Sequence, residues 1–86
     1  MKGKQLIVTL YESLKQKIGN PEKAFSIFDA NFEGRISVNE FERVIITFGK
    51  DVFKEADIHL LIQIAKGENE STKVIKYKEF CAKFFD

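Results

Sequence analysis

One stretch of the chain places oxygen-bearing residues at intervals suited to a hard metal ion. It runs from Asp29 to Glu40, and its candidate donors stand at the first, third, fifth, seventh, ninth and twelfth positions. Calcium takes six to eight oxygen ligands, and a twelve-residue loop supplies them at these offsets. In chain order the candidates are Asp29, Asn31, Glu33, Arg35, Ser37 and Glu40. Together they predict one calcium site.

The candidates would donate in different ways. Asp29 and Asn31 offer short side-chain oxygens, and Arg35 would offer only its backbone carbonyl. Ser37 would act directly or through a water. Glu40 would give both carboxylate oxygens, and this bidentate contact would couple the ion to the helix that follows the loop.

Three residues decide how closely this loop fits the EF-hand pattern D-x-[DN]-x-[DN]-G-x5-E. Gly34, at the sixth position, permits the positive φ that the turn needs. Glu33 stands where a shorter acid or amide is usual, so its extra methylene should weaken binding. Phe32 occupies a position that normally faces solvent. We expect calcium binding here, and the alternative is a loop that keeps its shape without metal.

A second loop precedes Glu79 and lacks the same chemistry. Counting back twelve residues from Glu79 starts it at Glu68, with Lys73 in place of the glycine and Lys76 at the ninth position. The apolar spacing upstream instead starts the loop near Lys66, with extra residues. Because lysines in either register would repel a divalent cation, we expect no calcium in this loop.

Apolar residues recur at helical spacing on both sides of each loop. They predict helices over residues 4–18, 21–28, 38–48, 52–66 and 77–85. The first of these is amphipathic.

The first two helices are separated by Gly19-Asn20-Pro21. Gly19 suits a helix end, Asn20 suits an N-cap, and Pro21 suits a first helical position. The alternative is one long helix kinked at Pro21.

The two helix–loop–helix halves predict an all-α EF-hand pair with an additional N-terminal amphipathic helix. Pairing buries the apolar faces that a single hand would expose, and Ile36 and Ile75 should meet in a short antiparallel pairing between the loops. The second hand would then be a structural partner for the first. The expected division is residues 1–20 for the N-terminal helix and 21–86 for the pair, with hands at 21–48 and 52–86.

The segment from Lys23 to Asp29, Lys-Ala-Phe-Ser-Ile-Phe-Asp, closely resembles the first hand of the calmodulin superfamily, which includes myosin light chains and centrins. The likeness extends over residues 21–86 and covers a single lobe. It implies that the pair clasps an amphipathic helix of a larger protein, IQ-like or similar. The groove would be lined by Phe25, Phe28, Phe41, Val44, Ile45, Phe48, Ile58, Leu61, Ile62, Phe80 and Phe84. Met1 is the only methionine, so this groove is stiffer than a Met-rich one and favours one dedicated partner.

Composition narrows the classes of function. The chain has 86 residues, a formal net charge of +1, one His (His59) and one Cys (Cys81). It therefore offers no zinc set, and we expect no enzymatic activity. The lysines are spread along the chain, so we expect no nucleic-acid binding. No apolar run is long enough for a membrane span. The lone cysteine fits a cytoplasmic location, and the resemblance adds a cytoskeletal or ciliary partner.

These observations favour a calcium-modulated binding adaptor or light chain. The alternative is a calcium-independent structural module, either closed or permanently bound to its partner. Three readings stay open for residues 4–18: an accessory helix packed on the lobe, a helix that fills the lobe's own groove until a partner displaces it, or a surface for self-association.

Overall fold

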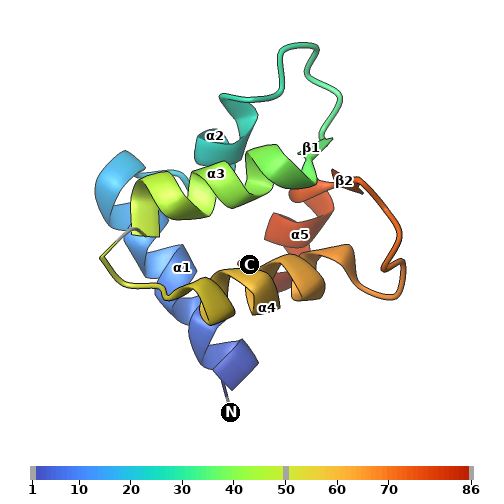
Figure 1. Cartoon of the computed structure of the whole chain (residues 1–86). Coiled ribbons are helices and arrows are strands. Elements are labelled where there is room, and N and C mark those ends of the chain that lie inside the picture. The colour runs from blue at the N-terminus through green and yellow to red at the C-terminus, as the bar shows by residue number, and fades with distance from the viewer. Residues whose placement is uncertain (1, 50, 86) are drawn as a thin grey trace.

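The computed structural model describes residues 2–49 and 51–85. This part of the chain is mostly helical, with one two-stranded antiparallel sheet (Figure 1). In chain order the elements are α1 (Lys2–Ile18), α2 (Pro21–Ser26), β1 (Ile36–Ser37), α3 (Val38–Gly49), α4 (Glu55–Lys66), β2 (Val74–Ile75) and α5 (Tyr77–Phe84). Among the described residues, no helix is both long and apolar enough to cross a membrane.

The break between α1 and α2 lies where the sequence predicted it. Gly19 has a φ of +86° and donates its N–H to the carbonyl of Lys15 at 2.9 Å, which closes the last turn of α1. Asn20 caps α2, because its Oδ1 accepts the N–H of Glu22 at 3.0 Å. The alternative of one helix kinked at Pro21 is therefore wrong.

The fourth helix begins at Glu55, three residues later than its apolar spacing predicted. Val52 and Phe53 instead form a turn, in which both backbone N–H groups donate to the carbonyl of Gly49 at 3.0 Å. Phe53 is buried directly against Gly49, where a Cβ would collide with its ring. Burial of Phe53 under the end of α3 thus overrides the local helical pattern.

The two loops meet in the short sheet. Ile36 pairs with Ile75 and Ser37 pairs with Val74, so the predicted antiparallel pairing is confirmed. Both isoleucines are buried. The backbone N–H of Val38 also donates to the carbonyl of Lys73 at 3.0 Å, which continues the pairing into the start of α3. The sheet therefore ties the helix–loop–helix unit of α2 and α3 to that of α4 and α5.

Aromatic rings fill the centre of the paired units. Phe25 stacks on Phe41 with 5.3 Å between ring centroids and lies 5.9 Å from Tyr77. Phe80 meets Phe41 edge-on at 5.4 Å. Such pairs add to the stabilisation that burial alone provides. This cluster draws side chains from α2, α3 and α5 and fixes how the two units sit together.

The N-terminal helix α1 is part of the same core. It packs against α2, α3 and α4 and runs across one end of α3 and of α4 (Figure 1). Leu10 and Leu14 are 0% exposed, and Ile7 is also buried. The Ser13 hydroxyl donates to the carbonyl of Phe48 at 2.6 Å, which joins α1 to the last turn of α3. The heptad-like apolar stripe of α1 therefore faces inward.

Candidate functional site

The carboxylate of Asp29 is the centre of the first loop. It follows α2 and is only 4% exposed. Its Oδ1 accepts the backbone N–H of Glu33 at 2.9 Å, and its Oδ2 accepts that of Gly34 at 2.8 Å. Gly34 has a φ of +81°, as its place in the turn required. Oδ2 also accepts the hydroxyl of Tyr77 at 2.7 Å. Three donors from the protein therefore hold this carboxylate.

These donors stabilise the charged form of Asp29. The hydrogen bond from Tyr77 is the main cause that lowers the pKa of Asp29, and burial opposes it. The N–H groups of Glu33 and Gly34 and the positive charge of Lys78 lower this pKa further. Burial, and then the neighbouring Asp29, raise the pKa of Tyr77 well above its ordinary value. Asp29 is thus a carboxylate anion that accepts a hydrogen bond from the protonated hydroxyl of Tyr77.

Glu40 and Ser37 form a reciprocal cap at the start of α3. The Oε1 of Glu40 accepts the N–H of Ser37 at 2.8 Å, and the Ser37 hydroxyl oxygen accepts the N–H of Glu40 at 3.0 Å. This is the capping box of an S-x-x-E sequence. In this arrangement both side chains serve the helix end.

The side chains of the other three residues at predicted ligand positions are exposed. The Nε of Arg35 lies 3.7 Å from the Oε1 of Glu33, and both side chains are about half exposed. Asn31 is exposed as well. Between them Phe32 is 82% exposed and has a φ of +54°, a left-handed conformation that is costly for an aromatic residue.

The six predicted ligands lie in one loop, between Asp29 and Glu40. Within residues 2–49 and 51–85, no group of three His, Cys, Asp or Glu side chains is placed to hold a metal ion. A calcium ion held by this loop would have to draw Glu40 from its cap and Glu33 from Arg35. Occupancy of the loop stays a prediction, which titration addresses.

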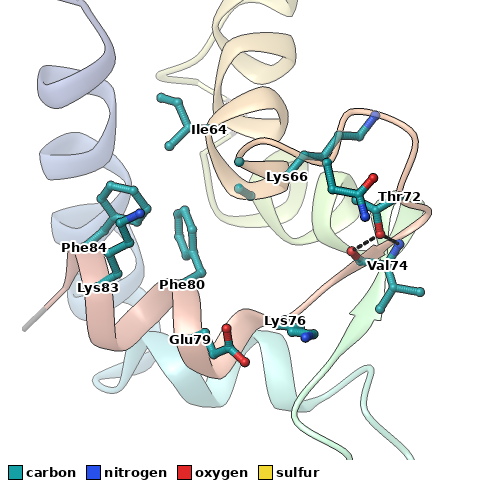
Figure 2. Close-up of a pocket in the computed structure, with 12 residues that line it drawn as sticks. Ile64, Lys66, Thr72, Val74, Lys76, Glu79, Phe80, Lys83 and Phe84 are labelled. Carbon is teal, nitrogen blue, oxygen red and sulfur yellow. Dashed lines mark hydrogen bonds between the residues drawn. The ribbon is translucent and has the colours of Figure 1, made fainter.

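The second loop is closed by its own side chains. The Nζ of Lys66 donates to the carbonyl of Glu70 at 3.4 Å. Thr72 bridges Val74, because its hydroxyl donates to the Val74 carbonyl at 3.0 Å and accepts the Val74 N–H at 3.2 Å (Figure 2). Glu79 is exposed. A lysine ammonium thus binds a backbone carbonyl of this loop.

Tyr77 is the site residue that sequence reasoning missed. It belongs to the second unit, yet it completes the hydrogen bonding of the first loop. A signal was present, since pairing Ile36 with Ile75 places the start of α5 beside the first loop. The backbone N–H of Lys78 accordingly lies 3.5 Å from the carbonyl of Gly34.

The predicted groove residues belong to one apolar cluster, and α1 packs against α2, α3 and α4, which carry most of them. Leu10, Leu14 and Ile7 of α1 belong to one continuous apolar cluster with the groove. Of the predicted groove residues, seven are buried and four are partly buried: Phe25, Phe41, Val44, Ile45, Leu61, Ile62 and Phe80, then Phe28, Phe48, Ile58 and Phe84. The arrangement agrees with the two readings in which residues 4–18 pack on the lobe, and self-association stays a prediction.

Comparison with protein-family models, with curated proteins and with solved structures gave no match.

Proposed function

We propose that this chain is a pair of EF-hands that works as a binding adaptor and has no enzymatic activity. The pair holds an amphipathic helix against its apolar face, and in the resting state that helix is α1. A helix of a larger protein then binds by taking the place of α1. The resemblance to the calmodulin superfamily implies a cytoplasmic partner of cytoskeletal or ciliary type.

One observation carries this proposal. The residues predicted to form a partner groove share one apolar cluster with Leu10 and Leu14 of the amphipathic helix α1, and both leucines are 0% exposed. Leu6, Leu10 and Leu14 stand four residues apart, which is the anchor spacing of helix-in-groove recognition. A partner with the same spacing has the chemistry to replace them.

The hydrogen bonds of the first loop favour a resting state that needs no ion. Tyr77, Glu33 and Gly34 supply the hydrogen-bond donors that the buried Asp29 carboxylate requires. The Ser37–Glu40 cap meanwhile satisfies the start of α3. The state with α1 bound thus satisfies these polar groups without an ion. Release of α1 then depends on competition with a partner helix.

A calcium-modulated adaptor is the second candidate, and the shape of the first loop favours it. Asp29 and Gly34 hold their turn through the hydrogen bond from Gly34, with the positive φ that the loop pattern requires. Calcium binding would have to draw Glu40 out of its cap, so it would also move α3. Calorimetric titration with calcium in the presence of magnesium separates the two candidates.

The helix competition is tested with a fluorescent peptide that copies residues 4–18. Ser13→Ala removes the bond from α1 to Phe48. Loss of one such bond costs about 1 kcal/mol, so the peptide should bind about fivefold more tightly to the variant. Thr9→Ala is the matched control, since the Thr9 hydroxyl donates to the carbonyl of Gln5 within α1. Equal affinities for Ser13→Ala and the unaltered chain would refute the proposal.

A further inference from the structure

Two adjoining hollows stay open while α1 is in place. One lies between α4, the second loop and α5 (Figure 2), and the other, of about 470 Å³, lies between α1, α4 and α5. They share Ile64, Lys83 and Phe84, so they form one continuous surface. We refer to the surface centred on these three residues as the lysine-rimmed cleft.

The floor of the lysine-rimmed cleft is apolar. Phe80 and Phe84 point from α5 toward Ile64 of α4 (Figure 2). Phe84 and Ile64 are only partly buried. On the α1 side the cleft reaches Val8, which is 49% exposed. An aliphatic or aromatic side chain of a partner would find van der Waals contacts here on three sides.

The rim of the cleft carries an excess of positive charge. Its charged lining comprises four lysines and one acid: Lys4, Lys66, Lys76, Lys83 and Glu79. Within the described part of the chain, none of the four lysines forms an ion pair. Lys83 instead lies over the ring of Phe84, 5.4 Å from its centroid. These charges are therefore available to a partner, and they repel a basic one.

From the apolar floor and the positively charged rim we propose that the lysine-rimmed cleft binds an acidic amphipathic segment of a partner protein. This segment places an apolar side chain between Ile64 and Phe84. Its carboxylates face Lys83 and Lys4, since the Nζ of Lys66 donates to the carbonyl of Glu70. The inference goes beyond the helix exchange proposed above, because this surface is open with α1 bound. The cleft also favours an acidic partner, because its four lysines would repel a basic segment of IQ type.

The test uses two synthetic helical peptides of about 15 residues, long enough to form a helix when bound. Both carry Leu and Phe along one face, and the other face carries Glu in one peptide and Lys in the second. Fluorescence anisotropy of the labelled peptides at low salt should show that the Glu peptide binds the chain and the Lys peptide does not. Because exposed charges are screened, its affinity should fall steeply as salt is raised.

Variants locate the binding surface. Lys83→Glu should weaken the Glu peptide about tenfold, because it turns an attraction into a repulsion. Lys54→Glu, at the opposite end of α4, is the matched control and should leave the affinity unchanged. Val8→Glu should also weaken binding, and Ile46→Glu should not, although Ile46 is equally exposed on α3 at 45%. All four sites are exposed, so the variants keep the core.

Three outcomes would overturn the inference. They are the absence of binding by the Glu peptide up to millimolar concentration, equal or tighter binding of the Lys peptide, and equal weakening by Lys83→Glu and Lys54→Glu. Vesicles containing phosphatidylserine provide the remaining arm. If they sediment the chain in a Lys83-dependent manner while the peptide does not bind, the cleft is a lipid surface instead. Neither result depends on the response of Ser13→Ala, so the helix exchange is judged separately.

Discussion

Tyr77 donates a 2.7 Å hydrogen bond to the Oδ2 of Asp29 and thereby fastens the second helix–loop–helix unit to the first loop. Tyr77 is 1% exposed, and its ring also packs against Phe25. The contact is therefore both polar and part of the core. It makes the conformation of the first loop depend on the position of α5.

Tyr77→Phe should lower the midpoint of thermal unfolding by roughly 5 °C in a chain of this length. The ring stays, while the buried carboxylate loses one of its three donors. Circular dichroism during heating measures the shift. Tyr11→Phe is the matched control, because Tyr11 packs edge-on against Phe85 at 5.2 Å and lies on α1. Equal shifts in the two variants would show that the Asp29 contact is not what matters.

Stability should decline at both ends of the pH range through this same pair. The pKa of folded Asp29 is lowered, so its contribution is present above the unfolded value of about 3.9 and is lost as pH falls through the folded pKa. The pKa of folded Tyr77 is raised, so its contribution is present below about pH 10 and is lost as pH rises beyond that value. Urea unfolding at a series of pH values measures both slopes.

Tyr77→Phe provides the control for this pH dependence. It removes the phenol and the main cause of the lowered Asp29 pKa, so both slopes should become shallower. If the slope above pH 10 were the same in the variant, Tyr77 would not be the group that titrates there.

Glu40→Gln separates the helix cap from metal binding. Glutamine also serves at the third position of a capping box, so thermal stability should change little. Under the calcium-independent proposal, calorimetry should register no calcium heat for either chain up to millimolar concentration. A calcium heat in the unaltered chain that disappears in Glu40→Gln would establish the calcium-modulated candidate in its place.

Ser37→Ala tests the same cap from its other side. It removes the acceptor for the N–H of Glu40 and should destabilise the chain by about 1 kcal/mol. Ser26→Ala is a suitable control, because the Ser26 hydroxyl bonds to the carbonyl of Lys23 near the end of α2. Denaturant unfolding of both variants gives the comparison. Equal losses would mean that Ser37 has no special role at the start of α3.

Phe32→Asn should stabilise the fold by up to about 1 kcal/mol. Asn tolerates the left-handed backbone at this position better than an aromatic residue does, and the exposed ring gives up almost no burial. Val52→Asn is the control at another exposed apolar site. Loss of stability in Phe32→Asn would indicate that the ring contributes contacts in the native state.

The sequence predicted the fold correctly where a residue's own backbone preference, or its place in the repeat, determines the local structure. Gly19, Asn20 and Pro21 end and restart a helix by their backbone preferences, and Ile36 and Ile75 stand at matching places in two repeated units. The start of α4 was missed because Val52 and Phe53 extend the helical apolar pattern. Only the neighbouring Gly49 makes room for the Phe53 ring.

The candidate site was harder to predict, because one residue can satisfy two patterns. Ser37 and Glu40 fit the ninth and twelfth ligand positions, and they also fit the S-x-x-E cap that the structure contains. Tyr77 was missed for another reason: no local pattern links it to a carboxylate 48 positions earlier, and only the pairing of Ile36 with Ile75 indicated that α5 begins near the first loop. Such a contact follows only from packing of the whole chain.

The 48-residue separation between Asp29 and Tyr77 bears on how the chain matures during synthesis. A nascent chain that has emerged only as far as α3 has the first loop but lacks Tyr77 and the strand that pairs with Ile36. Its Asp29 then has only the loop's own N–H groups as donors. We therefore expect the first half to reach its native form only together with the second, in one cooperative step.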